Sequence, residues 1–138
     1  MAHQIDITKD FAIPVERLFA YLAEHENLST VFAPAKITRL RDGDTSRNGV
    51  GSVRRVQMPG SGPLEETVTA YQENALIEYK ITKGGPLRNH HGIMRFSGTG
   101  AGSKLHYTID FEGKFPLVAT IVRLILTRGI NKGLAAIR

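Results

Sequence analysis

Apolar and polar residues alternate over residues 3–13, which predicts a strand with one buried face. The pattern then changes to a helical one. Pro14 and Glu16 suit the start of a helix, because proline is tolerated in the first turn and an acidic side chain there favours the helix dipole. The apolar stripe of this helix is Val15, Leu18, Phe19 and Leu22. Residues 24–32 predict a second short helix or turn that ends before Pro34.

Six further segments have strand character and are separated by turn-forming residues. Such short connections, rich in glycine, proline, asparagine and aspartate, favour antiparallel neighbours. We expect these strands at 36–41, 50–58, 64–72, 75–82, 88–98 and 103–114, which makes seven strands in all.

Residues 116–138 predict one long, mostly apolar helix, with Pro116 in its first turn. Its apolar residues recur at roughly helical spacing: Leu117, Ile121, Leu124, Ile125, Ile130, Leu134 and Ile137. A helix of this kind after a series of antiparallel strands needs a curved sheet to pack on. The sequence therefore predicts an α+β fold with a cavity between sheet and helix.

Alternation within each strand assigns side chains to the face that packs on this helix. The inward sets in strands 75–82 and 103–114 are Ile77, Tyr79 and Ile81, and Leu105, Tyr107, Ile109 and Phe111. The same parity brings three ionisable residues onto an otherwise apolar face. Arg54 shares a face with Ser52, Val56 and Met58, Glu66 with Leu64, Val68 and Ala70, and His90 with Gly92, Met94 and Phe96.

Two of these charges are expected to pair. A turn at 59–63 places residue 56 opposite residue 66, so that Arg54 and Glu66 lie diagonally across the two strands, within reach of each other. Since buried charges are costly unless paired, this pair with His90 nearby is our candidate for the polar end of a ligand pocket. A purely structural ion pair is the alternative, and a β-bulge would turn these side chains outward.

Composition narrows the chemistry. The 138 residues predict a single domain, 1–138, which is large enough to fold without metal or disulfide. The chain has no cysteine, which excludes disulfides and thiolate chemistry. The first residues have neither a basic region nor an apolar core, so we expect no signal peptide and a cytoplasmic location.

Several functional classes are disfavoured by the pattern of residues. His90 and His91 are neighbours on a strand and point to opposite faces, so we expect no metal site and no cofactor. The glycines at 98–102 join two strands instead of opening a helix, which favours a turn over a phosphate loop. The net charge is +5, but the basic residues are scattered, so we expect no nucleic-acid partner.

The last helix also contains basic residues, namely Arg123, Arg128, Lys132 and Arg138. Such a helix can contact an anionic membrane surface at the periphery. We favour the other interpretation, in which its apolar side packs on the sheet and its basic side chains are solvated. Its apolar run is too short and too charged to span a bilayer.

From Ile5 to the last helix, the chain resembles the START/Bet v 1-like superfamily (SRPBCC), which has the helix-grip fold. It is most similar to the polyketide cyclase/dehydrase and lipid-transport branch. The resemblance is carried by PVERLF (14–19), GVGSVRRV (49–56), LEETVTAY (64–71), LIEY (76–79), HHG (90–92) and GSKL (102–105). It implies a seven-stranded curved antiparallel sheet wrapped around the C-terminal helix, with Arg54, Glu66 and His90 where the family often keeps Arg, Glu and His.

The resemblance implies a cavity for a small hydrophobic ligand with a polar or anionic group, such as a lipid, quinone or aromatic polyketide. We expect its wall and polar end to comprise Met58, Tyr79, Met94, Phe96, Tyr107 and Phe111, with Arg54, Glu66 and His90. An alternative is a cyclase or dehydratase in which His90 is the general acid/base, Glu66 orients it and Arg54 stabilises an enolate oxygen. A second alternative is an interaction protein without a ligand. The sequence leaves open the ligand, catalysis, oligomeric state, pathway and any lid motion of the last helix.

Overall fold

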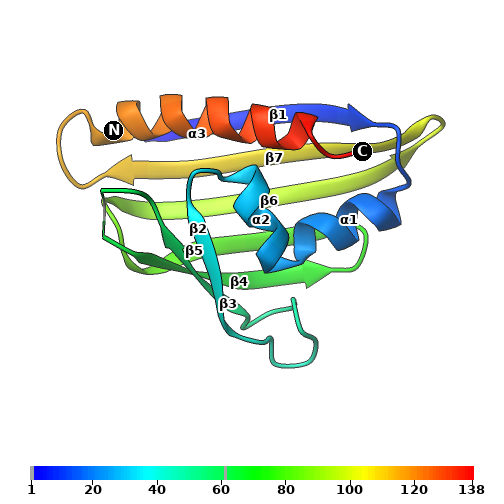
Figure 1. Cartoon of the computed structure of the whole chain (residues 1–138), viewed down its shortest axis with the longest axis horizontal. Coiled ribbons are helices and arrows are strands. Elements are labelled where there is room, and N and C mark those ends of the chain that lie inside the picture. The colour runs from blue at the N-terminus through cyan, green and yellow to red at the C-terminus, as the bar shows by residue number, and fades with distance from the viewer. Residues whose placement is uncertain (1, 61) are drawn as a thin grey trace.

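The computed structural model describes residues 2–60 and 62–138, and within these it contains one antiparallel sheet with the helices against one face (Figure 1). The strands lie in the order β1-β7-β6-β5-β4-β3-β2. Their bounds are β1 His3–Phe11, β2 Lys36–Arg41, β3 Val53–Gln57, β4 Leu64–Gln72, β5 Leu76–Gly84, β6 Leu87–Thr99 and β7 Gly102–Gly113. The helices are α1 Val15–Ala23, the 3₁₀ turn η1 His25–Asn27, α2 Leu28–Val31 and α3 Val118–Ala135.

The sheet curls so strongly that β2, the strand at its far edge from β1, returns toward the helices. β2 contacts η1 and α2, while α3 packs on β1, β7 and α2. Figure 1 shows α3 lying along the β1–β7 side of the sheet, with β2 passing in front of the other strands. The α+β class, the element order and the helix-grip arrangement predicted from the sequence are confirmed.

The hairpin between β3 and β4 has a different register from the one expected. Arg54 lies directly opposite Glu66, and Val56 lies opposite Leu64, instead of residue 56 opposite residue 66. The connection is longer than 59–63, and pairing resumes just after Pro63, which has no N–H to donate to a ladder. Direct opposition brings the two charged side chains closer than the diagonal arrangement would.

A bulge in β4 reverses its alternation beyond Val68. Val68 lies opposite Tyr79, but Tyr71 lies opposite Ile77, with the register shift between them. Tyr71 therefore packs on the core, where its ring meets that of Phe19 at 5.3 Å between centroids. The prediction that Ala70 faces inward is wrong, because the extra residue shifts the parity of the strand.

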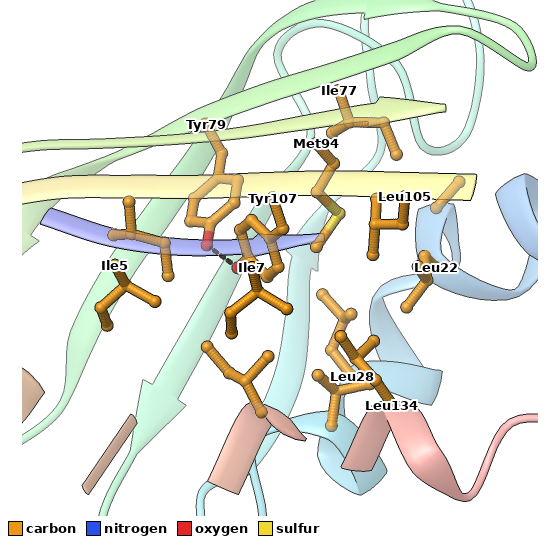
Figure 2. Packing of buried hydrophobic residues seen from close by; sticks show 14 of the residues in the cluster. Ile5, Ile7, Leu22, Leu28, Ile77, Tyr79, Met94, Leu105, Tyr107 and Leu134 are labelled. Atoms are coloured by element: carbon orange, nitrogen blue, oxygen red, sulfur yellow. Dashed lines mark hydrogen bonds between the residues drawn. The ribbon is translucent and has the colours of Figure 1, made fainter. Parts of the chain in front are cut away.

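The core lies between the sheet and the helices. Figure 2 shows Tyr79, Met94 and Tyr107 among aliphatic side chains, with the two tyrosine hydroxyls hydrogen-bonded to each other. Leu22 of α1, Leu28 of α2 and Leu134 of α3 cover this layer (Figure 2). Gly92 lies directly opposite Tyr79 on β6, and a Cβ there would overlap the tyrosine ring.

The residues of α3 that face the sheet are partly different from those predicted. The inward face of α3 comprises the buried Ala119, Ile130, Gly133 and Leu134 and the half-buried Val118, Val122 and Leu126, and Ile137 packs on the core just after the helix. Leu117, Ile121, Leu124 and Ile125 are exposed, so the prediction that they pack on the sheet is wrong. Ile121 and Leu124 are three residues apart and share a helical face of their own, and Leu117 directly precedes the helix. The first turn also begins at Val118 instead of residue 116, because Leu117 has a left-handed backbone with φ 69°.

Two glycines in α3 give a prediction about how this helix packs. A Cβ at Gly133 would lie 2.5 Å from the Cα of Val31, whereas at Gly129 the nearest atom is the carbonyl oxygen of Ala33 at 3.5 Å. We expect Gly133→Ala to lower the free energy of unfolding by about 1–3 kcal/mol, since α2 must shift. Gly129→Ala, the matched control, should raise it by up to about 1 kcal/mol through helix propensity. Urea denaturation of both variants measures this, and equal stabilisation by both would contradict the close packing of α2 on α3.

Candidate functional site

A cavity of about 310 Å³ lies between the curled end of the sheet and the first half of α3. This volume is within the range of small-molecule sites. The walls come from the α2–β2 connection, β3 to β7, the loops between them and α3. They comprise Phe32, Ala35, Val56, Met58, Pro59, Gly62, Leu64, Glu66, Tyr79, Ile81, Pro86, Leu87, His90, Ile109, Val122, Ile125 and Leu126. The lining is thus mostly apolar, with polar groups concentrated at one carboxylate, one imidazole and one phenol.

Arg54 forms an ion pair with the carboxylate of Glu66. Its Nε donates to Oε1 of Glu66 at 2.8 Å, and both side chains are buried. The guanidinium also lies over the ring of Tyr79, 4.6 Å from its centroid. Burial tends to lower the pKa of Arg54, but the Glu66 carboxylate opposes this and the net shift is upward, so the arginine stays charged. Arg54 itself is outside the cavity lining, so its guanidinium does not contact a ligand there directly.

His90 shares the inward parity of Gly92, Met94 and Phe96, and a bulge in β6 lies just before it. Asn89 has a left-handed backbone with φ 53°, and the register with β7 shifts between Arg88 and His91. This irregularity allows Leu87 and His90, three residues apart, both to be buried. The ring nitrogen Nδ1 of His90 accepts a hydrogen bond from the backbone N–H of Ile81 at 3.0 Å.

That hydrogen bond fixes where the proton of the imidazole lies. Because Nδ1 accepts, the neutral ring carries its hydrogen on Nε2, which is 3.9 Å from Oε2 of Glu66. Burial lowers the pKa of His90 despite the nearby carboxylate, so the ring is neutral at pH 7. The cavity therefore presents a hydrogen-bond acceptor, Glu66, beside a hydrogen-bond donor, the Nε2–H of His90.

The remaining polar groups near the site are also neutral. Burial raises the pKa of both Tyr79 and Tyr107, whose hydroxyls are bonded to each other. Burial lowers the pKa of His25 to about 3, and its Nε2 lies 3.1 Å from the hydroxyl of Ser52. That hydroxyl donates to the carbonyl of Gly49 at 2.7 Å, so it accepts from Nε2 of His25, and this second bond ties the residue before β3 to η1.

The structure brings some of the predicted site residues together and separates others. Four of the nine line the cavity: Met58, Glu66, Tyr79 and His90. The other five are buried outside its walls: Arg54, Met94, Phe96, Tyr107 and Phe111. Neighbouring side chains cover both phenylalanines of this group. Phe96 packs on Phe19 of α1 at 4.9 Å between ring centroids, and Phe111 stacks on His3.

Sequence reasoning missed the part of the wall that comes from loops and from α3. Pro59 and Pro86 lie in connections between strands, to which alternation does not apply, and apolar residues in turns were the available signal. Val122 and Leu126 are one helical turn apart on the inward face of α3 and continue to Ile130 and Leu134 at the same spacing. That i, i+4 series was the signal for the helical wall.

Two further findings concern only the part of the chain described. No group of three or more His, Asp or Glu side chains in residues 2–60 and 62–138 is placed to hold a metal ion. In the same residues, no helix has the length and apolar character needed to cross a bilayer.

The chain belongs to the polyketide cyclase/dehydrase and lipid transport family, whose model matches residues 2–138. It is similar in structure to a START superfamily protein from Mycobacterium smegmatis, with a TM-score of 0.79 and 18% identity over 96% of this chain and 94% of that one. For the Zhui aromatase/cyclase from Streptomyces sp. R1128, the TM-score is 0.76 and the identity 17%, over 98% of this chain and 93% of that one. For norcoclaurine synthase from Thalictrum flavum, the TM-score is 0.70 and the identity 16%, over 98% of this chain and 90% of that one.

At these identities the structural matches establish the shared fold. A search among curated proteins finds no match to this sequence. The family match therefore gives the class of the protein, and the structural matches give its fold.

The buried ion pair gives a prediction about stability. Glu66→Leu leaves the guanidinium of Arg54 buried without its carboxylate, and we expect a loss of about 3–5 kcal/mol in the free energy of unfolding. The double variant Arg54→Met/Glu66→Leu removes both charges and should recover much of that loss. Denaturant unfolding of the wild type, both single variants and the double variant measures the coupling. Additive losses in the double variant would show that the two side chains do not depend on each other.

Proposed function

We propose that this protein binds a small, mainly apolar molecule in the cavity and holds it through one hydrogen-bonding group. The observation that carries the proposal is the pairing of Glu66 and His90 in an otherwise apolar wall, with Arg54 neutralising the carboxylate from behind. Apolar pockets with a few convergent polar groups are typical of small-molecule sites. Membership of a family that includes lipid transport proteins and polyketide cyclases supports the same conclusion.

The charges around the cavity favour a neutral polar group on the ligand. Arg54 is engaged by Glu66 and lies outside the wall, so an anionic ligand group would meet a carboxylate before it met the arginine. A hydroxyl or phenol can donate to Glu66, and a carbonyl or hydroxyl can accept from Nε2 of His90. The proposed ligand is therefore an apolar chain or ring system with hydroxyl or keto groups at one end, instead of an anion.

A cavity-filling substitution tests where this ligand binds. Val56 lines the cavity, whereas the next residue, Gln57, is exposed on the other face of β3. We expect Val56→Trp to weaken binding of a neutral solvatochromic dye such as Nile red at least tenfold, because the indole occupies the cavity. Gln57→Trp, the matched control, should bind as the wild type does. Fluorescence titration measures both, with circular dichroism to verify folding.

Unchanged dye affinity in folded Val56→Trp would overturn the cavity as the binding site. Native mass spectrometry of the purified protein, followed by extraction, identifies any molecule that copurifies. The same cavity variant should lose that molecule as well.

A second candidate function is supported by the acceptor–donor pair. A carboxylate beside an N–H donor can enolise a ketone: Glu66 would remove a proton from the carbon next to the carbonyl, and Nε2–H of His90 would stabilise the enolate oxygen. The enolate carbon could then attack a second carbonyl of the same chain, closing a ring while the new alkoxide takes up the proton. These roles differ from those expected from the sequence, because Ile81 orients His90 and Arg54 lies outside the wall.

Two substitutions of His90 distinguish hydrogen-bond donation from proton transfer. Gln retains an N–H donor but cannot act as an acid or base at neutral pH. Leu can neither donate a hydrogen bond nor transfer a proton. If His90 acts only as a hydrogen-bond donor, His90→Gln should change the ligand affinity and the rate of α-deuterium exchange in a diketone by no more than severalfold. His90→Leu should lower both quantities about tenfold or more. NMR in D₂O measures the exchange and titration measures affinity. If Gln and Leu abolish exchange equally while the ligand still binds, His90 transfers the proton itself.

A further inference from the structure

An apolar strip lies on the outward face of α3 and the residues just before it. Phe115, Leu117, Ile121 and Leu124 are 66%, 74%, 54% and 67% exposed. Ile121 and Leu124 are three residues apart and project from one side of the helix. Leu117 directly precedes the helix, and its carbonyl accepts a hydrogen bond from the N–H of Ile121 at 3.1 Å. We call these four residues the outer strip. Large apolar side chains gathered in this way on a surface mark an interaction site, unlike single exposed ones.

The charged residues of the chain segment that carries the outer strip have one sign. From residue 114 to residue 138 the chain has no aspartate or glutamate, but it has Lys114, Arg123, Arg128, Lys132 and Arg138. A shallow hollow of about 320 Å³ adjoins Phe115 and Leu117, and its lining includes His3, Arg88 and Lys114. Apolar side chains flanked by cations are thus present on one surface, at the start of the longest helix.

We propose that the outer strip docks this protein on an anionic lipid bilayer, with α3 lying in the plane of the interface. Leucine, isoleucine and phenylalanine side chains can enter the boundary between headgroups and acyl chains, while the flanking lysines and arginines attract anionic headgroups. The binding is peripheral, because no helix in the described residues is able to span a bilayer.

The charge pattern favours a bilayer over a second copy of the chain. In a two-fold dimer built on this surface, each outer strip would face its own copy, and the surrounding cations would meet cations. The headgroups of an anionic bilayer would instead attract these cations. The sequence alone favoured solvation of the basic residues because the apolar positions were assigned to the sheet, and the exposure of the outer strip removes that reason.

Vesicle binding tests the proposal with the intact chain. We expect sedimentation with phosphatidylcholine vesicles that contain 30% phosphatidylglycerol, at least tenfold weaker binding to pure phosphatidylcholine, and loss of binding as NaCl is raised. The double variant Ile121→Ser/Leu124→Ser should bind anionic vesicles at least tenfold more weakly. The matched control is Leu40→Ser/Val50→Ser, which removes two exposed apolar side chains far from α3 in the sequence and should bind as the wild type does.

A fluorescent reporter adds a second measurement. The natural chain has no tryptophan, so Leu124→Trp gives a single tryptophan, whose emission we expect to shift to shorter wavelength on anionic vesicles. The proposal is overturned if the wild type does not bind anionic vesicles, or if the outer-strip and control variants bind equally well. It is also overturned if analytical ultracentrifugation shows that the outer strip forms a dimer while vesicle binding is absent.

Discussion

An ionised carboxylate in the wall of an apolar cavity destabilises the folded protein unless a nearby positive charge compensates its negative charge. Here Arg54 lies directly opposite Glu66 across β3 and β4, and its Nε contacts Oε1 at 2.8 Å. The guanidinium is outside the cavity and covers the ring of Tyr79, so the same residue supports two groups of the polar wall. This arrangement leaves Oε2 of Glu66 near His90, and it makes the cavity suitable for a hydrogen-bonding neutral group.

The division of the sheet into a filled half and an open half follows from where the helices pack. α1, α2 and the second half of α3 cover the region of Met94 and Leu105 (Figure 2), where both side chains are buried. Apart from Ala119, the first half of α3 supplies only half-buried residues to the covered face, such as Val122 and Leu126. Because the sheet curls back toward the helices at β2, the space beneath this half of α3 is enclosed without being filled.

The sequence predicted the fold well because element order and turn composition are local signals. It also placed Arg54, Glu66 and His90 on the covered face, since alternation survives in the stretches that carry them. It could not give the β3–β4 register, which depends on where the ladder resumes after Pro63, nor the bulge that turns Tyr71 inward. It also merged two apolar stripes of α3 into one, because spacing alone does not say which stripe the sheet covers.

Between Ala119 and Ile130, all residues of α3 are described and none is fully buried. This segment has the cavity on one side and the outer strip on the other, and Ile125, which is 52% exposed, also belongs to the cavity wall. Segments with few buried contacts are the least stable parts of a fold, since little free energy opposes their local opening. A ligand beneath Val122 and Leu126, or a lipid surface against Ile121 and Leu124, would supply contacts that the protein itself lacks there. The two proposed interactions therefore act on the same turns of one helix, from opposite sides.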